Sequence, residues 1–349
     1  MAEEPKAKIP NFEFLKPLFN EDLNSEGAVK IVGSTFQRSR ILGELEEITY
    51  DLAFQDWREL RRQNMLDKAN AILEMHDNKH RFNALKDAIK GSGVVPFIGA
   101  GLSIPSGYQG WTAFLWEMQG ESHVPENDLK ALLTAGLYEE AAQLLYDDLG
   151  PGLFDKQLRE SYARTTTVIG PVNFLPVVFP STNVITTNFD LVLEGVFKNQ
   201  DQGFDQILHG NSLPEVIRLF TEGTRLLVKM HGLCNIIADR VLLREEYERA
   251  YADAGAVKRF FTKFIFAKSM LFLGCSLTTD RTLKTMVEVV TEEGASTLPA
   301  HYAFLELKAG DDRIQRKKDL AQSNIFPIWY PEGEDDESIE ALLTALMED

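Results

Sequence analysis

The sequence predicts an α/β protein with a doubly wound, mostly parallel, Rossmann-like sheet, a small helical module inserted in it, and an N-terminal helical extension. Three observations support this class. Apolar runs of strand length recur, each run ends in a polar or glycine-rich cluster, and helical sequence separates them. The runs lie in Val94–Ser103, Asn183–Asp190, Leu226–Gly232 and Met270–Leu277. Such runs are typical of buried parallel strands, and an open sheet binds its ligand at the carboxyl ends of these strands.

The helical extension is predicted over residues 1–85. Between Ile41 and Ile89, apolar residues recur mostly every three to five positions, as on one face of a helix. Within that stretch, 68–75 and 82–89 look like separate helical pieces, whereas residues 1–40 carry few signals. The extension either packs on the sheet domain or forms an interface with another copy or a partner.

The sheet domain is predicted over residues 86–332, with a helical insertion at about 105–180. The insertion should be mostly helical over Trp111–Tyr162, with a break at the Gly-Pro-Gly of residues 150–152. The second strand should end near Thr187 and lead into a helix. The remaining segments expected are a loop and short helix at 203–222, one or two helices at 244–268, strands at 301–307 and 325–330, and a C-terminal acidic amphipathic helix at 333–349.

Charge and composition exclude several functions. The chain has 349 residues, with 36 Lys and Arg against 53 Asp and Glu, a net charge of −17. Such an acidic chain repels phosphate backbones, so we expect no direct nucleic-acid binding by the chain alone. The apolar runs are too short to cross a membrane. The start, MAEEPKAKIP, has no apolar signal-peptide core, so a cytoplasmic location is expected.

The two cysteines, Cys234 and Cys275, are too few for a four-cysteine zinc site and form no CxxC pair. A disulfide between them is not expected in a reducing cytoplasm. We therefore interpret both as small, partly buried side chains, and we expect no metal site.

The glycine-rich segment that follows the first strand suggests a nucleotide site. Gly99, Ala100 and Gly101 come directly after apolar sequence, where backbone N–H groups can approach a pyrophosphate. The dinucleotide fingerprint of dehydrogenases nevertheless fails, because Ile104 stands where its third glycine belongs. The short motif alone is equally consistent with a tight turn.

Three polar residues at strand ends are candidates for chemistry. His231 ends the run LLVKM and precedes a glycine, so its ring should project from the sheet edge, with an ordinary pKa suited to proton abstraction. Asp190 suits an N-cap of the following helix and could also organise a site. Asn188 has no such local task, and its amide can bind a polar ligand. Packing remains the alternative interpretation of the histidine.

The segments GAGLS, TTNFD, MHG and FLGCSL, in this order and spacing, resemble the sirtuin-like NAD-binding domain over about residues 85–332. The prokaryotic branch, whose members cleave NAD in antiphage defence, is most similar. The catalytic residues that the resemblance implies are Asn188, Asp190 and His231. The cofactor-binding residues that it implies are Gly99, Ala100, Gly101, Ser103, Thr187, Gly274, Ser276 and Leu277.

Two departures from deacylating sirtuins concern the substrate. The zinc module that supports their peptide groove needs four cysteines, and their Asp-Phe-Arg segment is replaced by residues 108–111, YQGW. The resemblance therefore implies an NAD glycohydrolase that needs no metal and acts as an abortive-infection effector. The alternatives are a regulatory subunit that binds NAD or ADP-ribose without turnover, and a protein deacylase. The resemblance also implies a homo-oligomer that works with a second subunit, such as a nucleic-acid-handling ATPase or an Argonaute-like protein.

Overall fold

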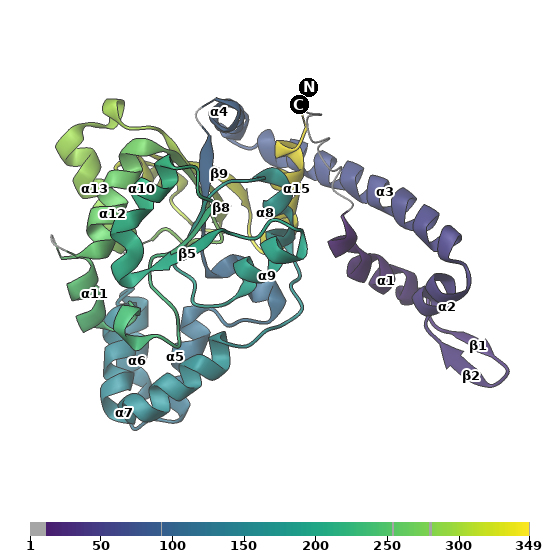
Figure 1. Ribbon diagram of the computed structural model, residues 1–349, viewed down its shortest axis with the longest axis horizontal. Coiled ribbons are helices and arrows are strands. Elements are labelled where there is room, and N and C mark those ends of the chain that lie inside the picture. The colour runs from purple at the N-terminus through teal and green to yellow at the C-terminus, as the bar shows by residue number, and fades with distance from the viewer. Residues whose placement is uncertain (1–11, 92, 253–254, 279–280, 349) are drawn as a thin grey trace.

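A seven-stranded parallel sheet forms the centre of the protein (Figure 1). The computed structural model describes residues 12–91, 93–252, 255–278 and 281–348. The strands lie in the order β5-β6-β4-β3-β7-β8-β9, and every neighbouring pair is parallel. Their bounds are β3 Val94–Ile98, β4 Val184–Thr186, β5 Gln206–His209, β6 Leu226–Lys229, β7 Ser269–Leu273, β8 His301–Leu307 and β9 Ile325–Pro331. The predicted fold class is confirmed.

The central strand β3 shows why the sheet is doubly wound. All five of its residues are buried, but they alternate between two apolar cores. Val94 and Ile98 belong to one core, and Val95 and Phe97 belong to the other. A strand covered on both faces is continuously apolar in sequence, as this one is.

Helices cover each face of the sheet. The Val94 face packs against α4 (Asn78–Lys90), α8 (Leu175–Val178), α9 (Val192–Asn199) and α15 (Asp335–Leu346). The Val95 face packs against α10 (Val216–Thr221), α12 (Ala256–Ala267), α13 (Arg281–Glu293) and α14 (Arg313–Ala321). Where one or two helices were predicted at 244–268, two are present, α11 (Arg244–Ala250) and α12.

Strand β5 corrects the sequence interpretation of residues 203–222. These were expected to be a loop and a short helix, but Gln206–His209 pairs with β6 at the edge of the sheet. Of its four residues only Leu208 is buried, since an edge strand is covered on fewer sides. So short a strand with two polar ends carries too little apolar pattern to be predicted.

Three helices between β3 and β4 form a unit that we call the helical module. They are α5 (Trp111–Gly120), α6 (Glu126–Thr134) and α7 (Tyr138–Tyr162). Gly150, in the predicted break, has a φ of 75° and kinks α7. The module packs below the sheet in the view of Figure 1.

The N-terminal arm, residues 16–73, extends away from the sheet domain (Figure 1). It comprises α1 (Lys16–Ser25), a hairpin of β1 (Val29–Ile31) and β2 (Ser34–Phe36), α2 (Arg38–Leu45) and α3 (Glu47–Leu73). The separate helical piece expected at 68–75 is instead mostly the end of α3, a single helix of 27 residues. The domain boundaries at 85 and 332 stay predictions.

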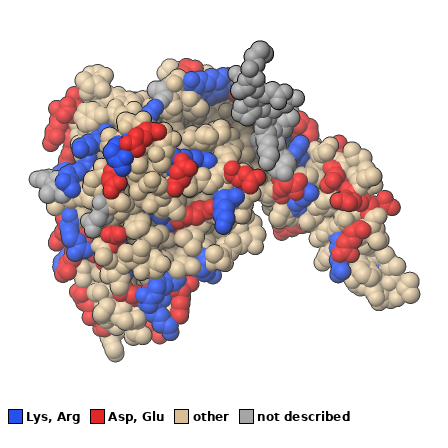
Figure 2. Space-filling model, viewed as in Figure 1, with Lys and Arg blue, Asp and Glu red and all other residues tan. Residues whose placement is uncertain are grey.

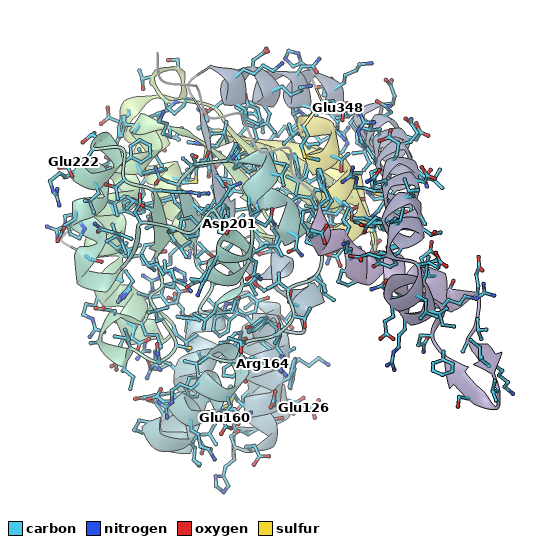
Figure 3. The ribbon with its side chains drawn as sticks, turned by 45° about the vertical axis from the view of Figure 1, so that its right-hand side comes forward. Glu126, Glu160, Arg164, Asp201, Glu222 and Glu348 are labelled. Atoms are coloured by element: carbon cyan, nitrogen blue, oxygen red, sulfur yellow. The ribbon has the colours of Figure 1, made fainter. Side chains whose placement is uncertain are left out.

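Ion pairs fasten the second half of α3 to the C-terminal helix. The Arg61 guanidinium donates two hydrogen bonds of 2.7 Å to the Glu340 carboxylate on α15. Arg62 pairs with Glu348, labelled in Figure 3, at 2.6 Å. The first half of α3, with α1, α2 and the hairpin, therefore overhangs the body as a preformed unit.

No helix in the described parts of the chain is long and apolar enough to cross a membrane.

Candidate functional site

Strand register brings the predicted site residues to one edge of the sheet. Thr186 pairs with Ile98 on β3 and with Lys229 on β6. Gly99, Asn188 and His231 follow these three residues by one or two positions. Because the strands are parallel, all three lie beyond the carboxyl ends of neighbouring strands, where such folds bind ligands.

Asn188 joins the second strand end to the glycine-rich segment. Its amide Nδ2 donates to the backbone oxygen of Gly99 at 3.1 Å and lies 3.2 Å from Ser103 Oγ. The Thr186 hydroxyl accepts a hydrogen bond of 2.9 Å from the Asn188 N–H and donates to the Ile98 oxygen at 2.8 Å. Thr186 therefore fixes this turn, a role that the sequence analysis missed. The neighbouring Thr187, which was predicted to bind the cofactor, is half-buried. Asn188 is buried and its position is fixed by at least three bonds.

Close packing of two loops explains the glycines. The Gly101 N–H donates to the Gly274 oxygen at 2.9 Å. A Cβ on Gly99 would lie 2.4 Å from that oxygen, and one on Gly274 would lie 2.6 Å from the Leu102 nitrogen. Gly274 also has a φ of +65°, which favours glycine. These glycines let the loops after β3 and β7 touch, so their presence follows from packing whether or not a phosphate binds.

Asp190 and a lysine that was missed from sequence stabilise the second strand end. The Asp190 carboxylate accepts a hydrogen bond of 3.0 Å from the Val192 N–H, so it caps the first turn of α9 from one residue before the N-cap. The Lys229 ammonium donates to the Asp190 backbone oxygen at 2.5 Å and pairs with Glu194 at 2.7 Å. The position of this lysine at the end of an apolar strand run could have indicated the ion pair, because a buried lysine needs a partner.

His231 lies in a pocket of tyrosines, which corrects two expectations. Its ring is buried, with Nε2 2.9 Å from the Tyr251 hydroxyl and Nδ1 3.5 Å from the Tyr247 hydroxyl. Tyr247 belongs to α11 and Tyr251 directly follows that helix. Together they cover the strand end, so the ring does not project from the sheet. Loss of hydration lowers the pKa of His231 to about 3, far from the ordinary value expected. The imidazole is therefore neutral near pH 7 and makes hydrogen bonds without carrying charge.

A cleft of about 1050 Å³ opens at the same sheet edge, beyond β7, β8 and β9. Four predicted cofactor-binding residues line it: Gly101, Gly274, Ser276 and Leu277. The remaining predicted residues do not line it: Gly99, Ala100, Ser103, Thr187, Asn188, Asp190 and His231. Lys284, Lys308 and Arg316 give the cleft three cations, and six Asp and Glu side chains also line it. The structure thus shows one half of the predicted site as an open cleft and the other half as a buried cluster.

Arg240 forms a buried charge cluster that also escaped sequence reasoning. Its guanidinium pairs with Asp155 on α7 and, at 2.8 Å, with Glu246 on α11. Glu246 additionally accepts the N–H of Leu242 and of Leu243 at 2.9 and 3.0 Å. The cluster connects the helical module to the helix that covers His231. Asp155 and Glu246 lie 85 and 6 positions from Arg240 in the sequence, and no local sequence pattern shows that the three come together.

A second contact joins the same parts of the molecule. Arg281, at the start of α13, binds the Glu139 carboxylate of α7 through Nε and Nη2, each at 2.8 Å. The Arg281 guanidinium also lies 5.7 Å from the centre of the Tyr247 ring, within cation–π range. Tyr251 reaches α13 as well, with its hydroxyl 3.3 Å from Thr282 Oγ1.

In the described parts of the chain, no three His, Cys, Asp or Glu side chains come close enough together to hold a metal ion. Neither Cys234, which is buried, nor Cys275, which is partly buried, forms a disulfide in the described structure.

Comparison with known families finds a match in the second half of the sheet domain. Residues 182–328, which include both strand ends that carry Asn188 and His231, match the family model of the SIR2-like domain. This match covers less than half of the 349 residues. The resemblance to sirtuins inferred from the four segments is thereby confirmed, although the glycine-rich segment at 99–103 lies outside the matched residues.

Two curated relatives share the name NAD(+) hydrolase ThsA. They come from Acinetobacter baumannii (strain 532279) and Enterococcus faecium, and they are 23% and 24% identical to this chain over 209 residues. The similar stretch covers 58% of this chain but only 40% and 41% of the relatives. The chain thus spans well under half the length of the relatives that it matches.

Proposed function

We propose that the protein is an NAD glycohydrolase that cleaves NAD to nicotinamide and ADP-ribose. The observation that carries the proposal is the convergence of Asn188, His231 and the glycine-rich loop on one sheet edge of a SIR2-like domain, beside a cleft of about 1050 Å³. A cleft of that volume suits a dinucleotide. Similarity to proteins named NAD(+) hydrolase supports the same reaction.

The proposed reaction breaks the bond between nicotinamide and ribose. Its electron pair leaves with the nicotinamide ring and neutralises the positive charge of that ring, while water attacks the ribose carbon and loses a proton. The protein must mainly orient these groups and stabilise an oxocarbenium-like transition state. In this proposal Asn188 positions the nicotinamide ribose or the water, and His231 accepts the proton. Gly99, Gly101 and Ser103 face the phosphates, and Ser276 lies toward the adenosine.

A binding subunit without turnover is the second candidate, because both nitrogens of His231 are occupied by tyrosine hydroxyls. Product analysis separates the two. Release of nicotinamide and ADP-ribose in equal amounts from NAD indicates the glycohydrolase, whereas intact NAD retained by a chain whose His231 is accessible indicates the binding subunit. Nicotinamide release only when an acylated peptide is added would instead indicate a deacylase.

We further propose an effector role in antiphage defence with a second subunit, such as a nucleic-acid-handling ATPase or an Argonaute-like protein. This part rests on the resemblance to the prokaryotic branch alone.

The N-terminal arm supports self-association. Its outer part exposes large apolar side chains: Ile31, Val32, Leu45, Ile48 and Leu52. Val32 is fully exposed and has a φ of 47°, a conformation that is strained for a β-branched residue. The hairpin end of the arm carries few charged side chains (Figure 2). An isolated two-stranded hairpin is only marginally stable, so contact with another surface would stabilise it.

The nearly balanced charge of the N-terminal arm favours a second copy of the chain as its partner. Residues 26–62 contain six basic and seven acidic side chains, although the whole chain has a net charge of −17. Two copies would therefore repel one another least if they met at their arms.

Replacing Ile48 and Leu52 with aspartate is expected to return the protein to a monomer of 39.4 kDa, whereas the wild type should have a multiple of this mass. Light scattering after size exclusion measures both. The exposed Leu153, on the helical module, provides the control, because Leu153→Asp should leave the mass unchanged. A monomeric wild type would contradict self-association through the arm.

A further inference from the structure

Helix α11 places two tyrosines against the histidine on which the proposed chemistry depends. The Tyr251 hydroxyl lies 2.9 Å from Nε2 and the Tyr247 hydroxyl 3.5 Å from Nδ1. The three rings are also in aromatic contact, with Tyr247 and Tyr251 stacked 5.7 Å apart and His231 edge-on to both. Imidazole has only these two nitrogens, so in this arrangement neither is left to act on a substrate.

Contacts with two other elements hold α11 in this position. Glu246 of α11 binds Arg240, which also pairs with Asp155 of the helical module. On the other side, Tyr251 contacts Thr282 of α13, and Tyr247 lies beneath the guanidinium of Arg281. Arg281 is in turn bound to Glu139 of the module through two nitrogens. The position of α11 thus depends on how the module sits against α13.

We propose that α11 is a gate: Tyr247 and Tyr251 hold His231 out of reach of NAD, and displacement of α11, released by breaking the contact between Glu139 and Arg281, opens the site. This inference rests on the proposed glycohydrolase function and names its regulation. Opening would extend the open cleft, which Gly101 and Gly274 already line, toward Asn188 and His231.

The gate also accounts for the state of the histidine. Burial beneath α11 lowers the pKa of His231 to about 3, so in the closed arrangement the ring is a poor proton acceptor. Removing the tyrosines would hydrate the ring and bring its pKa back toward the ordinary value for histidine. Displacement of α11 would therefore expose His231 and also raise its pKa, which makes it a better proton acceptor.

Modification of histidines by diethyl pyrocarbonate tests the gate without requiring activity. The reagent acylates accessible imidazoles, and peptide mass spectrometry gives a rate for each of the six histidines of the chain. Two histidines serve as internal references. The His123 side chain is 96% exposed and should react at once, whereas His301 is completely buried and should stay unmodified.

Two variants of the 349-residue chain are informative. Glu139→Gln removes the charge that binds Arg281 while keeping the shape of the side chain. Combined Tyr247→Ala and Tyr251→Ala substitutions remove the cover itself. Arg218→Gln, which breaks an exposed ion pair with Glu222 on α10, is the matched control. Nicotinamide release from NAD is measured on the same samples.

In the wild type we expect His231 to react slowly, in contrast to His123. Glu139→Gln should raise its rate by about fivefold to tenfold, as loss of a two-point ion pair favours local opening, and the tyrosine variant should raise it further. Arg218→Gln should change nothing, and His301 should stay protected throughout. Rapid modification of wild-type His231, or rates unchanged in both opening variants, would overturn the gate. Faster modification without nicotinamide release would support the gate and contradict the glycohydrolase.

Discussion

Replacing Arg240 with methionine is expected to lower the free energy of unfolding by about 3–5 kcal/mol, the usual cost of removing one partner from a buried ion pair. The guanidinium is almost wholly buried between Asp155 and Glu246. Without it, two carboxylates lie in the interior with no countercharge. Methionine keeps the apolar stem, so the loss measures the charge and its hydrogen bonds.

Urea denaturation with fluorescence detection gives this free energy. Arg218→Met is the control, since Arg218 is exposed and its pairs with Glu215 and Glu222 lie at the surface. Exposed ion pairs contribute little to stability because solvent screens them, so the control should unfold nearly as the wild type does. Equal losses in the two variants would show that the Arg240 cluster does not hold the module and α11 together.

The second large effect concerns activity. Asn188→Ala is expected to lower the rate of NAD cleavage by at least about a hundredfold, the loss typical when one preorganised polar group is removed from a site. Asn188 holds both Gly99 and Ser103, so its loss also releases the loop that we propose faces the phosphates. We expect the turnover rate to fall and KM to rise together.

Asn173→Ala separates this effect from simple loss of a buried amide. Asn173 is also buried, and its Nδ2 likewise donates to backbone oxygens, those of Val168 and Gly170 at 3.3 and 3.2 Å. Asn173 belongs to the short 3-10 helix Pro171–Phe174 and does not follow the end of a strand. If both variants lost similar activity at similar free energies of unfolding, the result would contradict a specific role of Asn188 in the site.

The sequence predicted the elements whose pattern is local. Strand β3 is buried on both faces and therefore reads as an uninterrupted apolar run. The edge strand Gln206–His209 has one buried residue and was missed. The single helix α3 was divided in two because tertiary contacts with α15, and not a regular apolar repeat, support its second half.

Positions within the site were predictable wherever they followed from strand ends. Asn188 and His231 meet at one edge because parallel strands place their carboxyl ends together. The environment of His231 was not predictable, because its partners Tyr247 and Tyr251 lie 16 and 20 positions further on, in α11 and directly after it. Only the folded chain shows that this helix covers the ring, and the ordinary pKa expected for His231 was wrong for that reason.

The measurement that tests the central claim most directly is product analysis with NAD and the variant that lacks the Tyr247 and Tyr251 side chains. We predict equal amounts of nicotinamide and ADP-ribose, released faster than by the wild type, and nearly none once Asn188→Ala is added. Two results would contradict the proposed glycohydrolase. One is intact NAD after incubation with a variant whose His231 reacts freely with diethyl pyrocarbonate. The other is nicotinamide release that survives Asn188→Ala.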